Sequence, residues 1–540
     1  MYLKVLTQKN KKDGHTRKYL QLVESKRING QPRQVVLASL GRFDTEQGEK
    51  KLEKLAKAFV DASQRLKLIN LARDLKALSC KEYGPLLVFK RIWQELDLGK
   101  VLKREFGDVN TEFDLSEAVF NMVLNRLTAP SSKRQLNLWE QNIDGIESFE
   151  LHQYYRALDY LIEHKEKIEQ GIFCQMRDLF HSKVDVVLFD TTTVAYYGDS
   201  NQHEELLDYG FSKIRRSDLK QIVVGIIMSK EGVPLGHEVF EGNKNDVTCF
   251  REIIDKISSK FQLGKVVLVG DRGMISKKNI AYLEEGGYQY ILGYRMRTIP
   301  QEKRHQVFSS SPFETLKGSS LQYKEVTYDG RRLIVCFNAE RAEKDREHRE
   351  RILERLEKKI STGKLASVID NKHYKRFLRI KGEKPTIDDE KVKRDEQYDG
   401  LFVLTSNTEM SGPEVVMSYK DLWQVELAFR QLKSEIEMGP IYHWKDRRIR
   451  GHIMVCFLAF VLRTTLYKKL KAASQEKVSY SGVVGDLKSL QTCELELGDS
   501  RAKVRTEMKP GATLAMKAMG MRPPDRILRL SGPGNVVVQT

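Results

Sequence analysis

The chain has 540 residues, with 92 lysines and arginines against 74 aspartates and glutamates, which gives a formal net charge of +18. Apolar residues make up 40% and charged residues 31% of the sequence, a mixture that excludes collagen-like, mucin-like and wholly disordered proteins. The length predicts roughly three or four domains. The positive charge predicts attraction to a polyanion, for which DNA, RNA and an anionic membrane are the candidates.

The cysteine and apolar patterns predict a soluble protein in a reducing compartment. The six cysteines are widely separated and form no Cys-x2-Cys pair, so we expect neither a structural zinc site nor a disulfide framework. The chain becomes charged too early for a signal peptide. The longest apolar run, 453–462, is shorter than the about 20 residues that span a membrane, and we expect a buried core helix there. These patterns predict a cytoplasmic protein without a membrane segment.

The first stretch of the chain, residues 1–44, predicts a small basic β module. Short β-like runs flank the turn signal Ile28-Asn29-Gly30-Gln31, which is typical of a hairpin. Residues 1–43 contain ten lysines and arginines but only two acids, well above their share of the positive charge. Both a DNA contact and a solvated edge hairpin are compatible with this pattern.

Two longer regions follow. Residues 45–180 have helical periodicity, and we expect a helical region that serves DNA binding or dimerisation. The loop 128–133 interrupts it and is a further candidate for DNA contacts. In residues 181–295, β-like runs come first in a meander and then alternate with helical segments, which predicts a mixed α/β sheet.

The last part of the chain contains an insertion. Residues 296–399 combine two β-like runs with a highly charged helix, whose i,i+4 opposite charges predict a solvated arm. Residues 400–472 return to the sheet with one strand and then a long helix over 417–438. Residues 473–540 form a basic C-terminal region.

Two carboxylates are predicted at the ends of apolar strands. Asp190 ends the run VDVVLFD, and Asp271 ends the run KVVLVGD. The carboxyl ends of strands in an α/β sheet open into a crevice where ligands bind. The pair therefore predicts a metal or phosphate site, although strand-end aspartates also cap helices and turns.

The helix 417–438 has one mixed strip beside its apolar face. Glu426, Tyr419, Trp423, Arg430 and Lys433 fall within a narrow sector of the helix at 100° per residue. An ion-pair ladder explains the charges alone. The two aromatic side chains on the same strip favour nucleic acid, because rings beside cations suit stacking on bases next to phosphates.

Together these motifs resemble a known family. FDTTT around Asp190, VLVGDRG around Asp271 and Y-x2-L-W-x2-E-x6-K in the helix are similar to the motifs of the DDE transposases of bacterial insertion sequences, in the group with a Y-x2-R-x3-E-x6-K signature. Tyr419, Glu426 and Lys433 match that signature. Leu422 stands where the signature has arginine, so one phosphate contact is missing unless Arg430 supplies it.

The resemblance implies the fold and the chemistry. It implies an α/β fold in which a β-rich insertion interrupts a ribonuclease-H-like catalytic core, beside the N-terminal basic β module and the helical domain. It implies that Asp190, Asp271 and Glu426 are catalytic and hold two Mg²⁺ ions about 4 Å apart, with Mn²⁺ as a substitute. Water then frees a 3′-OH at the element end, and this 3′-OH attacks target DNA.

The resemblance also implies the partners. Tyr419, Arg430 and Lys433 are expected to contact phosphate near the scissile bond, and Trp423 either stacks on a displaced base or packs in the core. The expected partners are double-stranded DNA, as terminal inverted repeats and as target, and a second copy of the chain in a homodimeric synaptic complex. The expected location is the cytoplasm, at the nucleoid.

Two other functions are compatible with parts of the pattern. A transposase-derived DNA-binding protein without activity would share the basic charge. An aspartyl-phosphate phosphatase would share the turn after Asp190, although Thr192 stands where its second carboxylate belongs. We interpret three nearby polar residues as structural: Asp246 as the N-cap of a helix, and His443 and His452 as residues outside any metal site.

Overall fold

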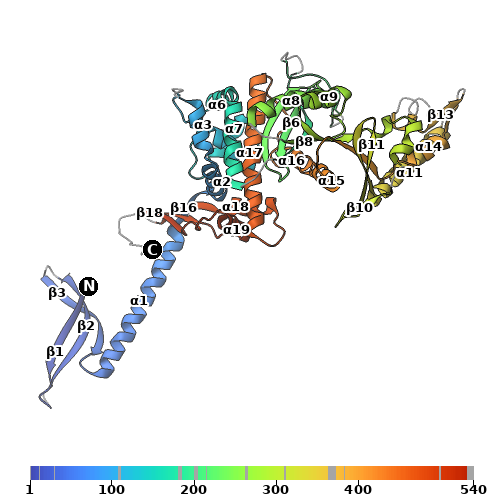
Figure 1. Cartoon of the computed structure of the whole chain (residues 1–540). Helices are drawn as coiled ribbons and strands as arrows, with labels where there is room; N and C mark the ends of the chain where they lie inside the picture. Colours follow the sequence, from blue (N-terminus) through green and yellow to red (C-terminus); the bar gives the residue numbers. More distant parts are fainter. Residues whose placement is uncertain are drawn as a thin grey trace. The chain divides into compact units, whose positions relative to one another are not determined.

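The computed structural model describes residues 2–10, 13–28, 31–107, 111–180, 185–199, 205–213, 216–261, 266–308, 312–362, 372–381, 384–497 and 500–531. The chain forms two compact units, drawn together in Figure 1. The first consists of Met1–Cys80, Thr492–Thr506 and Pro524–Thr540, and the second of Lys81–Gln491 and Glu507–Pro523.

The first unit begins with a three-stranded antiparallel sheet in the order β1-β2-β3. Its strands are β1 (Tyr2–Lys9), β2 (Thr16–Ile28) and β3 (Gln31–Arg42). Ile28 pairs with Gln31, so the predicted hairpin is confirmed, while Asn29 and Gly30 of its turn lie outside the described residues. Helix α1 (Glu46–Asp74) follows, with an acidic first turn that suits the helix dipole.

A second sheet of this unit joins the two ends of the chain. It has the order β18-β17-β16-β4 and consists of β4 (Leu75–Glu82), β16 (Gln491–Leu497), β17 (Ser500–Arg505) and β18 (Ile527–Ser531). Cys80 on β4 and Cys493 on β16 form a disulfide. The sequence analysis predicted no disulfide framework and did not predict this single disulfide, because it joins residues 413 positions apart, which cysteine spacing does not reveal.

The second unit contains a helical part around one long apolar helix. Helix α17 (Asp446–Ala473) packs on α4 (Leu115–Thr128), α6 (Leu151–Glu163) and the sheet strand β7 (Pro234–Glu241), between the other helices and the sheet (Figure 1). Among the described residues it is the one helix long and apolar enough to cross a membrane, but 94% of its apolar window is buried in the protein. The core helix predicted around 453–462 is confirmed.

Shorter helices complete this part. They are α2 (Gly84–Glu95), α3 (Leu98–Phe106), α5 (Leu136–Glu140), α7 (Lys165–Phe180), α18 (Tyr480–Ser489) and α19 (Pro510–Ala518). In the loop 128–133, Lys133 is only 3% exposed, so this side chain does not offer the DNA contact expected of the loop.

The sheet of the second unit has nine strands in the order β10-β11-β12-β15-β9-β8-β5-β6-β7. The strands of this sheet that come first in the sequence are β5 (Val186–Ala195), β6 (Gln221–Ser229), β7, β8 (Val267–Gly270) and β9 (Gln289–Tyr294). β5, β8 and β9 run parallel, and the other pairings are antiparallel, so the predicted mixed α/β sheet is confirmed. Helices α8 (Asp246–Phe261) and α9 (Lys277–Glu285) connect β7, β8 and β9.

Part of the insertion extends this sheet. Its strands are β10 (Glu314–Thr315), β11 (Leu321–Tyr328) and β12 (Arg331–Asn338), and β12 pairs with β15 (Leu401–Ser406). Beyond them lie α11 (Ala339–Ser361), the hairpin β13 (Leu378–Lys381) and β14 (Lys384–Ile387), and α14 (Asp389–Glu396).

Most of the charged helix α11 is exposed, as its charge pattern predicts, but one side of it is buried. Arg349 on α11 is 4% exposed and forms an ion pair with Asp399 at 2.6 Å. Ile352 and Leu356 are buried in a small core with Phe377. The i,i+4 charge pattern describes only the outer face of the helix, and the buried side depends on residues that follow in the chain.

The long helix expected over 417–438 is two helices. Helix α15 (Gly412–Lys420) is capped at its end by Asp421, and α16 (Trp423–Ser434) begins after Leu422. At the break, the Leu422 N–H donates to the Tyr419 carbonyl at 3.1 Å, which is an i to i+3 turn. Apolar periodicity does not detect this break because apolar and aromatic residues continue at three- and four-residue spacing across it, at Val416, Tyr419, Leu422, Val425 and Phe429.

Candidate active site

Two of the predicted acids lie side by side on neighbouring strands. The parallel pairing of β5 with β8 ends at Phe189 opposite Gly270, so the next residues, Asp190 and Asp271, are adjacent. The sequence analysis placed Asp190 at the end of its strand, but β5 continues past Asp190 to Ala195. Antiparallel pairing with β6 over the whole of β5 keeps the strand extended beyond the end of β8.

The third acid, Glu426, lies in the first turn of α16. The buried face of that helix, formed by Val425, Ala428, Phe429 and Leu432, packs into the core. Glu426 lines a cavity of about 970 Å³ together with Asp190 and Asp271. The tertiary fold thus brings to one cavity three acids that span more than 230 positions of the sequence.

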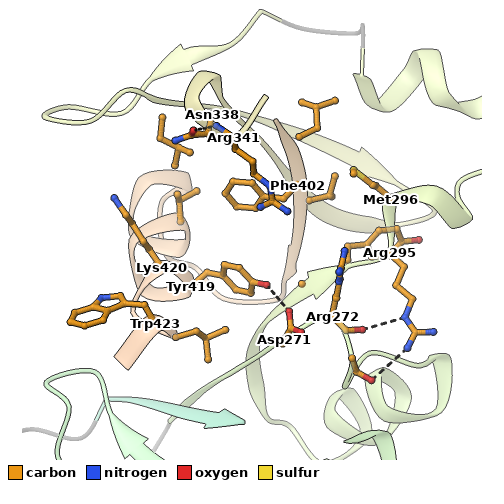
Figure 2. A pocket seen from close by; sticks show the side chains of 18 of the residues that line it. Asp271, Arg272, Arg295, Met296, Asn338, Arg341, Phe402, Tyr419, Lys420 and Trp423 are labelled. Atoms are coloured by element: carbon orange, nitrogen blue, oxygen red, sulfur yellow. Dashed lines mark hydrogen bonds between the residues drawn. The ribbon is translucent and has the colours of Figure 1, made fainter. Parts of the chain in front are cut away.

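The two aspartates experience different surroundings. Burial raises the pKa of Asp190 to about 6, with smaller contributions from nearby Asp271 and Asp246, while Lys213 and the Thr191 N–H act in the opposite direction. Asp271 accepts a hydrogen bond from the Tyr419 hydroxyl at 3.2 Å, as Figure 2 shows. Burial also raises the pKa of Tyr419. The phenol therefore stays protonated and serves as a donor.

The donor set fits a divalent metal ion of the hard class. Mg²⁺ prefers carboxylate oxygens, and adjacent carboxylates that disfavour each other's ionisation are stabilised by a cation between them. Over the described ranges, no three histidine, cysteine or acidic side chains are grouped closely enough to hold one ion together. Asp190 and Asp271 are thus the adjacent pair, and Glu426 would complete the ligand set from across the cavity.

The remaining residues of the mixed strip lie in different places. Trp423 is 54% exposed and lines the cavity, as does Tyr419. The Lys433 amine donates to the Thr192 hydroxyl at 2.6 Å, and burial lowers the pKa of Lys433. Arg430 is exposed on α16. Leu422, at the position of the signature arginine, also lines the cavity.

Several cations that we did not single out in the sequence line the same cavity. They are Arg272, Arg295, Arg297, Arg341, Lys344 and Lys420. Arg295 donates to the carbonyl oxygens of Arg272 (3.2 Å) and Gly273 (3.5 Å), so it braces the loop after Asp271 (Figure 2). The Arg341 guanidinium lies over the Phe402 ring at 5.4 Å. The side chains of Arg341 and Lys344 come from the start of α11, a placement that only the fold determines.

The interpretation of Asp246 as an N-cap is wrong. Asn245 caps α8, because its side-chain oxygen accepts a hydrogen bond from the Thr248 N–H at 3.0 Å. Asp246 is the first residue of the helix, and its carboxylate faces Thr191 and Lys213. Adjacent Asn and Asp are both good caps, so the local sequence did not distinguish them.

Comparison with known proteins identifies the family of the chain. The family described as "Transposase DDE domain" matches residues 182–462, and "IS1634 family transposase, N-terminal domain" matches residues 4–67. None of the curated proteins matches this chain. Among solved structures, the chain is similar to a piggyBac transposase in a synaptic complex with hairpin DNA. The two sequences are 11% identical, the match covers 81% of each chain, and the TM-score is 0.38.

A second solved structure is a Mos1 transposase paired-end complex with the left transposon end. It is 11% identical, covers 34% of this chain and 60% of that chain, and has a TM-score of 0.15. The family assignment rests on the sequence matches, which confirm the resemblance inferred from the motifs. Because the DDE domain spans more than half of the chain, the protein belongs to the DDE transposases of insertion sequences, enzymes that cut and join DNA.

Proposed function

We propose that this transposase cuts the ends of its insertion sequence and joins the freed 3′-OH ends to target DNA at Asp190, Asp271 and Glu426. The observation that carries the proposal is that these acids, from β5, the loop after β8 and α16, line one cavity. The cavity also holds six basic side chains, which suits a polyanionic substrate.

The catalytic core in this proposal is ribonuclease-H-like. It consists of the strands β7-β6-β5-β8-β9 with β15 and the helices α15 to α17. In support, Asp190 is on β5, Asp271 directly follows the neighbouring parallel strand β8, and the glutamate is on a helix packed against β5. Residues 296–399, which include the elements β10 to α14, are the insertion between the second aspartate and the glutamate.

The three carboxylates would hold Mg²⁺, or Mn²⁺ in its place. Bound divalent ions would activate the attacking hydroxyl and offset charge on the leaving oxygen in an in-line displacement at phosphorus. The chain itself orients the ligands: the Tyr419 hydroxyl restrains one oxygen of Asp271, and Arg295 braces the loop that follows.

The basic side chains of the cavity would bind the phosphates that flank the scissile bond. Arg341 and Lys420 are candidates because both line the cavity beside the stacked rings of Phe402 and Tyr419. Trp423, exposed at the cavity, could stack on an unpaired base. Lys433 holds α16 against β5 through Thr192, so it has to release this bond to reach phosphate. Arg430 would contact DNA from the exposed side of α16.

The sequence-specific DNA contacts would come from outside the cavity. In this proposal the basic β module of residues 1–44 and the helical region of 45–180 bind the terminal inverted repeats. The match of residues 4–67 to a transposase N-terminal domain supports this assignment. The exposed positive charge there would make binding weaken steeply with salt. The basic segment 473–540 and the location at the nucleoid belong to the same proposal.

Two element ends have to be held together, which makes a homodimer the expected assembly. Helix α1 supports it, because Leu55, Phe59 and Val60 are exposed on a helix of the first unit, with Phe59 at 63%. Exposed apolar side chains of this size on one helix are typical of an interaction surface. We expect Phe59→Glu to shift the protein from dimer to monomer in light scattering.

The variant Glu426→Gln tests the catalytic assignment. A supercoiled plasmid bearing the element's ends is incubated with Mg²⁺ and wild type, Glu426→Gln or the exposed control Glu476→Gln. We expect cutting by wild type and the control and none by Glu426→Gln, with unchanged binding of all three proteins to end DNA. Equal cutting by Glu426→Gln would remove Glu426 from the ligand set.

The same assay separates the alternatives. An inactive DNA-binding derivative would bind the ends without cutting in any of the three forms. A phosphatase would hydrolyse small phosphomonoesters and leave the plasmid intact. The phosphatase has little support here, because the Thr192 hydroxyl, two residues after Asp190, is already bonded to Lys433.

A further inference from the structure

A polar cluster lies next to the catalytic aspartates and is not used by the mechanism above. The buried Thr191, which follows Asp190 on β5, donates its hydroxyl hydrogen to the Asp246 carboxylate. The Lys213 amine donates to the Thr191 carbonyl (2.8 Å) and hydroxyl (2.9 Å) and lies 3.4 Å from Asp246 Oδ1. Lys213 and Asp246 therefore hold the residue beside Asp190 from two sides.

The other oxygen of Asp246 faces the second aspartate's loop. A Cβ added to Gly273 would lie 3.2 Å from Asp246 Oδ2, so the carboxylate packs directly against the turn after Asp271. That turn is closed by a hydrogen bond from the Met274 N–H to the Asp271 carbonyl at 3.0 Å. Asp246 thus touches the segments of both metal-ligand candidates, one with each oxygen.

We propose that Asp246 is a positioning residue, which with Lys213 and Thr191 sets the separation of the Asp190 and Asp271 carboxylates. The inference rests on the proposed function of these aspartates as metal ligands. Asp246 acts through its neighbours: its Oδ1 is already bonded to Thr191, and within the described chain it is not among the residues that line the cavity. Groups that orient metal ligands typically change metal affinity by about 10–100-fold when replaced.

The test measures Mn²⁺ binding to the full-length protein without DNA, by electron paramagnetic resonance of the free ion. Asp246→Asn keeps the shape of the side chain but removes the charge that faces Lys213. We expect a rise in the apparent Kd for Mn²⁺ of about 10–100-fold. In plasmid cutting, we expect the Mg²⁺ concentration for half-maximal rate to rise, while the rate at saturating Mg²⁺ falls much less.

A matched control distinguishes a positioning role of Asp246 from the general effect of removing an acid that is paired with a lysine. Asp114 also stands at a helix start, where it caps α4 and lies 3.0 Å from the Lys103 amine with an exposure close to that of Asp246. Asp114→Asn should leave the Kd for Mn²⁺ unchanged. It should lower thermal stability by at least as much as Asp246→Asn.

A second pair of variants keeps the proposal testable if Asp246→Asn folds poorly. Thr191→Val removes the bridging hydroxyl without a change of shape and should weaken Mn²⁺ binding, and Thr191→Ser should restore it. Wild-type affinity in both Asp246→Asn and Thr191→Val, with binding lost in Asp190→Asn, would overturn the positioning role alone. Wild-type affinity in Asp190→Asn as well would instead overturn the proposed metal site.

Discussion

Lys133 allows a quantitative prediction, because among the described residues its buried amine has no hydrogen-bond partner. The side chain is 3% exposed. Burial and repulsion from Arg126 lower the pKa of Lys133 from 10.5 to about 7. The folded protein therefore binds this proton less tightly than the unfolded chain does, and the fold loses stability as the pH falls from about 10.5 towards 7.

The size of the effect follows from the pKa difference. At 1.36 kcal/mol for each pKa unit, the charge on Lys133 costs on the order of 4 kcal/mol at pH 7. Methionine has a similar shape and no charge, so Lys133→Met should raise the free energy of unfolding at pH 7 by up to that amount. The gain should shrink as the pH rises from 7 towards 10.5 and vanish only above 10.5, where the wild-type amine is neutral in both states.

The assay is urea unfolding followed by tryptophan fluorescence at pH 7 and pH 9.5. Lys90→Met is the control, because the Lys90 amine forms an ion pair with Glu117 at 2.5 Å and should give no gain. A Lys133→Met variant no more stable than wild type at pH 7 would refute the reasoning. So would a gain of the same size at both pH values, since the charge would then not be its source.

Three further predictions concern the active site and the basic module. Because the pKa of Asp190 is raised to about 6, protons compete with the metal ion for this carboxylate below pH 6. The affinity for Mn²⁺ should therefore fall about tenfold per pH unit below pH 6 and level off above it. An affinity that does not change between about pH 5 and 8 would contradict this prediction. Removing the hydroxyl that donates to Asp271, in Tyr419→Phe, should slow plasmid cutting about 5–10-fold, and an unchanged rate would exclude an orienting role. Replacing the exposed Arg27 and Arg33 with alanine should lower the slope of log affinity for end DNA against log salt by about 2, whereas an unchanged slope would remove both from the DNA interface.

Much of the candidate site could be predicted from the sequence. Asp190, Asp271 and Glu426 stand in three motifs that occur in order around an insertion, and the fold brings all three to one cavity. The residues that position these acids could not be predicted from local sequence patterns. Asp246 was interpreted as a cap because an Asp before a helix usually is one, and its contact with Thr191, 55 positions earlier, exists only in the folded chain.

By itself, the amino-acid sequence determined the N-terminal hairpin, the mixed sheet and the buried helix α17, because turn residues and apolar periodicity report the conformation of neighbouring residues. Only the tertiary structure decided how far β5 continues past Asp190, that insertion strands join the same sheet, and that Cys80 meets Cys493. It also decided that the amine of Lys133 is buried. Each of these features depends on contacts between residues far apart in the chain, and such contacts are selected by the packing of the whole domain rather than by any local pattern.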